Sequence, residues 1–175
     1  MRSRFPLVEI AIVLVAAALI YILERPRHEA NVAEQHSLNA VYNLYVYKAA
    51  IEKYTAYNNG VYPTSPDSVE LFLEGGDRES GKPGRYPLNP YTGQILSKKD
   101  IGWTRYNNIG DSRDQSPNGP NGSRTGAPGT ISAAWFIPPG ETLAVEYGLI
   151  TFGEDFTPVF RVEPSGEKRI IVIHD

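Results

Sequence analysis

The sequence predicts an α+β fold in which a long N-terminal helical stem packs on a C-terminal antiparallel sheet of about four strands. Three observations support this fold class. An apolar run opens the chain, apolar positions then recur every three or four residues up to residue 57, and segments rich in β-branched and aromatic residues follow residue 131. We expect a basic leader-like segment at residues 1–4, the stem at 5–30 and one globular head at 31–175.

The composition excludes several classes of protein. The net charge is −3, and lysine and arginine form no cluster, so we expect no nucleic-acid partner. Cysteine is absent, which excludes disulfides and thiolate metal sites. The three histidines neighbour no plausible nucleophile, and no glycine-rich phosphate loop follows a strand. We therefore expect no catalytic residue, no enzymatic activity and no cofactor.

The stem is the most informative segment. From Ile10 to Leu23 there is no charged residue, and only Glu9 interrupts the apolar run near its start. A helix of roughly 17 residues reaches about 25 Å, the lower limit for crossing a bilayer. A lone carboxylate costs roughly 2.5–3.5 kcal/mol at mid-membrane, so we expect Glu9 to have a partner that lipid cannot supply. Because Arg2 and Arg4 precede the run, the positive-inside rule places the N-terminus in the cytoplasm and most of the chain outside.

The helix is predicted to continue beyond the stem, with Pro26 as its only interruption. Proline lacks the backbone donor and clashes with the preceding turn, so we expect a kink or a local opening there. Between residues 31 and 58, five apolar residues alternate at spacings of four and three and define one helix face: Ala40, Leu44, Tyr47, Ile51 and Tyr54. Asn58-Asn59-Gly60 is a strong stop signal.

Residues 59–130 are predicted to be mostly loop, with one short helix that starts at Ser65 and Pro66. The polar stretch 107–130 is long, and loops of this length are usually functional or disordered. Asn121 in it begins an Asn-Gly-Ser triplet, which is an N-glycosylation acceptor. Four side chains of this stretch carry oxygens of the kind that binds calcium, but their spacing fits no defined motif and favours a solvated loop: Asp111, Asp114, Asn118 and Asn121.

The last part of the chain, residues 131–175, is predicted to be the antiparallel sheet. Turn signals rich in proline and glycine separate four segments of strand-like composition: Ile131–Ile137, Thr142–Phe152, Thr157–Glu163 and Arg169–His174. We expect one face of this sheet to pack on the helix at 31–58.

The front of the chain resembles the N-terminal segment of type IV pilins and of type II secretion pseudopilins. It reads Phe5-Pro-Leu-Val-Glu9, continues with an apolar run, and reaches Pro26 twenty-one residues after the phenylalanine. In that family a methylated phenylalanine begins the mature chain, and a glutamate and a helix-bending proline follow at these two spacings. The family's peptidase usually requires glycine before the phenylalanine, where this chain has Arg4, so cleavage of residues 1–4 and methylation of Phe5 stay open.

The resemblance implies a structural subunit of an extracellular helical filament, similar to a type IV pilus, that assembles through its N-terminal hydrophobic helix. Its implied partners are copies of itself, the inner membrane before assembly, a prepilin peptidase and the pilus assembly machinery. The family pairs Glu9 with the terminal amine of a neighbouring Phe5, and Arg4 or Arg2 of a neighbour is the substitute if cleavage fails. Two alternatives remain: a pseudopilin of a type II secretion system, and a binding domain anchored by a single membrane pass.

Overall fold

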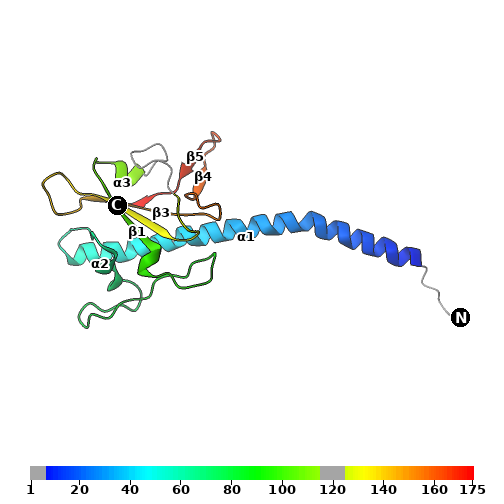
Figure 1. Ribbon diagram of the computed structural model, residues 1–175, viewed down its shortest axis with the longest axis horizontal. Coiled ribbons are helices and arrows are strands. Elements are labelled where there is room, and N and C mark those ends of the chain that lie inside the picture. The colour runs from blue at the N-terminus through cyan, green and yellow to red at the C-terminus, as the bar shows by residue number, and fades with distance from the viewer. Residues whose placement is uncertain (1–6, 115–124) are drawn as a thin grey trace. The chain divides into compact units, whose positions relative to one another are not determined.

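The computed structural model describes residues 7–114 and 125–175. The chain divides into two compact units, of which the first ends at Gln35 and the second comprises His36–Asp175. Helix α1 (Leu7–Tyr57) contributes its first part to the first unit and its second part to the second unit (Figure 1). The protein is therefore α+β with a long N-terminal helix, as the sequence predicts.

The stop signal at the end of α1 acts as expected. Asn59 and Gly60 both take the left-handed conformation, with φ of 55° and 86°. The Gly60 amide then donates to the carbonyl of Thr55 at 2.9 Å. This bond satisfies one of the carbonyls that a helix end leaves without a donor.

The main sheet has four strands in the order β1-β2-β3-β6, and it is mixed. Strand β1 (Ile101–Tyr106) runs parallel to β2 (Ile131–Phe136), whereas β3 (Glu146–Thr151) is antiparallel to both β2 and β6 (Ile173–His174). The prediction of a purely antiparallel sheet within residues 131–175 is therefore wrong. Its edge strand β1 comes from the region 59–130, which was expected to be loop.

The physical reason lies in the long connection between β1 and β2. Parallel neighbours cannot be joined by a tight hairpin and need a crossover of a dozen residues or more. Residues 107–130 supply that length, and the short helix α3 (Asp111–Asp114) lies within them and contacts β2 and β3. The segment expected at Thr157–Glu163 does not join the main sheet, because β4 (Phe160–Val162) pairs with β5 (Lys168–Ile170) in a separate two-stranded sheet.

The core of the second unit lies between α1 and the main sheet. Four of the five predicted α1 face residues are at most 1% exposed: Ala40, Leu44, Tyr47 and Ile51. Leu44, Tyr47 and Ile51 join a hydrophobic cluster with Val69 of α2 (Pro66–Glu70) and with residues of β2 and β3. Every residue of β2 and β3 is buried. Residues of α1 and of these strands share one hydrophobic cluster, and α3 also packs against β2 and β3. A short 3₁₀ turn, Lys98–Asp100, leads into β1.

Candidate assembly surface

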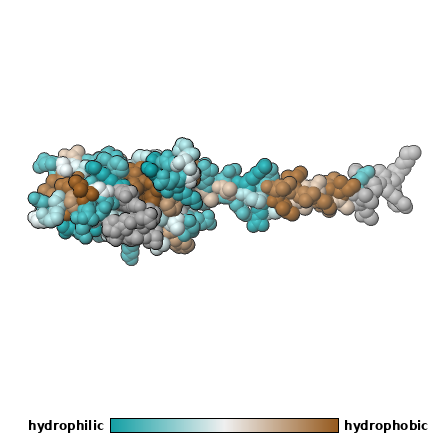
Figure 2. Space-filling view, turned by 90° about the horizontal axis from the view of Figure 1, so that it is seen from above, coloured by the Kyte–Doolittle hydropathy of each residue, from teal (hydrophilic) through white to brown (hydrophobic). Residues whose placement is uncertain are grey.

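The first unit presents an apolar helix surface without a cover. Ten large hydrophobic side chains between Ile10 and Leu23 are 47% to 69% exposed: Ile10, Ile12, Val13, Leu14, Val15, Leu19, Ile20, Tyr21, Ile22 and Leu23. Figure 2 shows them as a hydrophobic band on α1. An exposed apolar surface that is this continuous marks an interaction site.

The apolar surface surrounds the helix instead of following one side. Successive residues of an α-helix are 100° apart, so the four consecutive positions from Ile12 to Val15 point in four directions around the axis. All four of these side chains are at least 60% exposed. A helix that is hydrophobic on all sides must be surrounded on all sides, whereas an amphipathic helix needs only one partner surface.

Glu9 is the only charged residue between Leu7 and Leu23. Its side chain is exposed, and no ion pair involves it within the part of the chain that the structure describes. Arg2, Arg4 and Phe5, the residues predicted to act with Glu9, lie outside the described residues. Glu9 is therefore exposed on the apolar helix, and its pairing with Arg2, Arg4 or Phe5 stays a prediction.

Pro26 lies inside α1, which continues on both sides of it without an assigned break. Because proline has no N–H, the carbonyl of Ile22 lacks its usual donor. Two exposed ion pairs flank the proline: Arg25 Nε lies 2.8 Å from Glu29 Oε1, and Arg27 Nη1 lies 3.7 Å from Glu24 Oε1. Each exposed pair stabilises the helix by only about 0.3–0.5 kcal/mol. Among the described residues, no helix has the length and apolarity expected of a membrane span.

Two of the four weak calcium candidates, Asp111 and Asp114, lie in α3. Asp111 accepts a hydrogen bond from Asn108 Nδ2 at 2.9 Å, and Asp114 is the last residue of α3. Asn118 and Asn121 lie outside the described residues. Within residues 7–114 and 125–175, no three histidine or acidic side chains lie close enough together to hold a metal ion.

A carboxylate network that the sequence did not indicate fixes α3. Glu146 of β3 is 2% exposed, and its Oε1 accepts hydrogen bonds from the Gly110 amide at 2.9 Å and from the Ser112 hydroxyl. Its second oxygen lies 3.5 Å from Arg113 Nε, and Arg113 also donates two hydrogen bonds to Asp175, at 2.8 and 2.6 Å. Burial acts to raise the pKa of Asp175, but the hydrogen bonds and the positive charge of Arg113 outweigh it and hold the pKa below its usual value. The network therefore ties the crossover to β3 and to the C-terminal residues.

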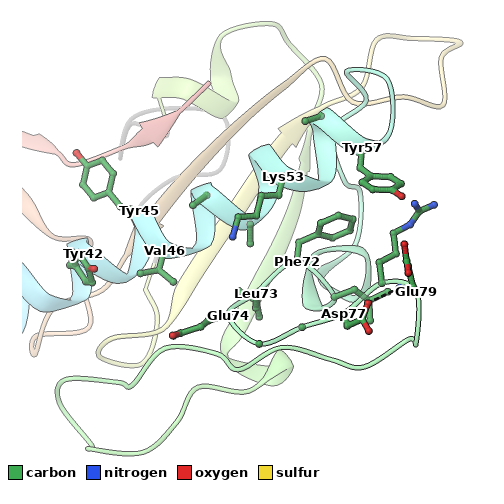
Figure 3. A pocket seen from close by; sticks show the side chains of 17 residues that line it. Tyr42, Tyr45, Val46, Lys53, Tyr57, Phe72, Leu73, Glu74, Asp77 and Glu79 are labelled. Carbon is green, nitrogen blue, oxygen red and sulfur yellow. Dashed lines mark hydrogen bonds between the residues drawn. The ribbon is translucent and has the colours of Figure 1, made fainter.

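The second unit also has an open groove along the exposed side of α1 (Figure 3). Its volume is about 1020 Å³, and its two walls are α1 and the segment 71–79. Tyr42, Tyr45 and Tyr57 are 54% to 67% exposed there, whereas Tyr47 is fully buried. The guanidinium of Arg78 lies 3.9 Å from the centre of the Tyr57 ring. The groove is therefore rich in the aromatic side chains that protein interfaces favour.

No protein-family model matches this chain, and no curated protein or solved structure is significantly similar to it. The resemblance to the pilin family thus rests on the residues between Phe5 and Pro26.

Proposed function

We propose that this protein is a structural subunit of an extracellular helical filament of the type IV pilus kind, and that it polymerises through the apolar part of α1. The observation that carries the proposal is the ring of exposed aliphatic side chains between Ile10 and Leu23. Bundling with identical helices buries these side chains, and each Å² of apolar surface removed from water stabilises the bundle by about 25 cal/mol. When copies associate through unlike surfaces and the rotation between them does not close, an open helical filament results.

Glu9 sets the alignment of neighbouring helices in this proposal. A buried carboxylate without a partner is strongly destabilising, so each subunit must bring a cation to the Glu9 of its neighbour. That cation is the free amine of a processed Phe5, or Arg4 or Arg2 where residues 1–4 are retained. The cytoplasmic membrane holds the subunit before assembly, and the prepilin peptidase and assembly machinery that the resemblance implies then act on it.

The test is to image material sheared from cells that make the full chain and to label it with an antibody against the second unit. We expect labelled fibres with the wild-type chain and few or none with Glu9→Gln. Glu24→Gln is the matched control, because Glu24 is a carboxylate of the same helix that pairs with Arg27 within its own chain. Fibres of normal abundance with Glu9→Gln would contradict the role of Glu9.

A double-mutant cycle identifies the cation. If Arg4 is the partner, Arg4→Ala and Glu9→Ala together reduce assembly no more than either change alone, and additive effects would reject the pairing. N-terminal sequencing of the polymer shows directly whether Phe5 is the first residue. If wild-type cells shed no fibres, the proposal fails in favour of a pseudopilin that forms a short periplasmic assembly or of a membrane-anchored binding domain.

A further inference from the structure

Phe156 occupies a backbone conformation that bulky residues avoid. It lies in the turn between β3 and β4 with φ of +63°, in the left-handed region, and its side chain is 56% exposed. Its amide donates to the Gly153 carbonyl at 3.1 Å, and the Gly153 amide donates to the Thr157 carbonyl at 2.8 Å. Tight turns of this kind favour glycine at the left-handed position, where a bulky side chain is an outlier.

The surrounding residues hold Phe156 in this conformation. The Phe156 carbonyl accepts a hydrogen bond from the Gly126 amide at 3.1 Å. The Asp155 carboxylate accepts from the amide and the hydroxyl of Thr157, at 3.1 and 2.8 Å. A strained residue that these hydrogen bonds hold in place, and that still leaves 56% of its side chain exposed, breaks a local folding rule for little gain in packing. Such sites are where function is expected.

The same chain carries a surface that fits this turn. On the α1 wall of the groove, Ala49 is small and exposed and leaves room beside the exposed rings of Tyr42 and Tyr45. Lys53 lies on the same wall (Figure 3) and has no ion pair within the described residues. Glu154, two residues before Phe156, is exposed and likewise lacks an ion pair within the described residues.

We propose that the Phe156 turn of one copy docks into the α1 groove of a second copy, with the Phe156 ring between Tyr42 and Tyr45 and Glu154 paired with Lys53. The inference rests on the proposed function, because the stems must first bring copies together. Acidic residues at 74, 77 and 79 line the opposite wall of the groove, so they direct Glu154 toward Lys53.

The two surfaces are different parts of the second unit. Glu154 lines a small pocket together with His36, whereas the groove lies along α1 from Tyr42 to Tyr57 and does not include Glu154. Docking of one surface onto the other is therefore a heterologous contact. A contact between unlike surfaces builds an open filament when the rotation between successive copies does not close into a ring.

Phe156→Gly separates this role from a role in folding. Glycine is unstrained at φ of +63°, so we expect the melting temperature of the full chain to stay unchanged or to rise. Phe156 is 56% exposed, so loss of its ring should weaken the contact between copies by about five- to twenty-fold, measured as the concentration at which polymer sediments. Ile109→Gly is the control, because it removes an apolar side chain that is 75% exposed elsewhere on the unit. A lower melting temperature with Phe156→Gly, or polymer at the wild-type concentration, would overturn the proposal.

The absence of cysteine permits a second test by cross-linking. A chain with both Ala49→Cys and Glu154→Cys should form a ladder of oxidised multimers on polymerisation, whereas each single variant can give at most dimers. Glu141→Cys with Ala49→Cys is the matched control, because Glu141 is an equally exposed acid in another turn. The charge reversals Lys53→Glu and Glu154→Lys should each weaken assembly and should restore it when combined.

The two proposals fail in different ways. Fibres without the Ala49–Glu154 cross-link ladder would overturn the docking of Phe156 and leave the stem-mediated filament standing. The absence of both fibres and ladder from a folded full chain would reject both proposals.

Discussion

Truncation of one stem side chain should shift the assembly equilibrium by a measurable amount. Leu14 is 64% exposed, so about two thirds of its surface is still available for burial. Full burial of a leucine stabilises by about 1.5–3 kcal/mol, and the remaining share is therefore about 1–2 kcal/mol. Leu14→Ala removes most of that share, and we expect the critical concentration for polymerisation to rise by about tenfold. The helix itself should not weaken, because alanine has the highest helix propensity.

The assay is to remove detergent from purified full chain over a range of concentrations and to measure the protein left in the supernatant after ultracentrifugation. Leu143→Ala is the matched control, because Leu143 is 48% exposed and lies in the connection between β2 and β3. Its critical concentration should equal that of the wild type. An unchanged value for Leu14→Ala, or an equal rise for both variants, would refute the reasoning that stem burial drives assembly.

Three further predictions concern the second unit. Glu146→Ala leaves the Gly110 amide and the Ser112 hydroxyl without their acceptor, so the free energy of unfolding in urea should fall by about 1–3 kcal/mol. Glu146→Gln, which keeps one acceptor oxygen, should lose less. Because the pKa of Asp175 is held below its usual value, its contribution to stability is complete above the unfolded pKa of about 3.9 and is lost as the pH falls through the folded pKa. The difference in melting temperature between wild type and Asp175→Asn should therefore be constant at neutral pH and should vanish in acid; a difference that grows in acid would contradict the ion pair. Asn89→Ala removes the donor to Pro128 O and the acceptor for a turn amide, so denaturation should show a loss of about 2–3 kcal/mol, and no loss would show that water replaces both bonds.

The helix and its core face could be predicted because both depend on local signals. The alternation of four and three residues places Ala40, Leu44, Tyr47 and Ile51 on one side of α1. This side is buried and contributes to the core of the second unit. The stop at Asn59-Gly60 is also local, since it depends on two residues that tolerate positive φ. Periodicity and caps are readable without knowing the tertiary contacts.

The mixed sheet could not be predicted in the same way, because strand pairing depends on distant residues. The sequence Ile101–Tyr106 has aromatic and β-branched residues, but Gly102 and Arg105 interrupt it, and turn residues surround it. Its partner β2 lies beyond the crossover 107–130, and nothing local to β1 indicates that partner. The length of the crossover was the available signal, because a connection longer than a dozen residues permits parallel pairing.

The network around Glu146 was missed for a related reason. Glu146 is the first residue of a mostly apolar strand, and a glutamate at a strand end is usually exposed to solvent. The structure buries it because Gly110, Ser112 and Arg113 of the crossover supply three donors to one carboxylate. These hydrogen bonds join residues more than thirty positions apart in the chain, and no local sequence pattern indicates such contacts.

The surfaces proposed for assembly contribute different things to a filament. Aliphatic side chains around a helix attract other helices without preferring one rotation or one shift along the axis, because hydrophobic attraction is not directional. The apolar residues from Ile10 to Leu23 therefore stabilise the assembly but do not fix the axial register between neighbouring helices. A register requires contacts that work at one position only, such as the carboxylate of Glu9 or a shaped contact between Phe156 and the groove. Truncations in the ring should thus change how much polymer forms, whereas changes at Glu9 or Phe156 should also change its helical order, as diffraction from imaged fibres can measure.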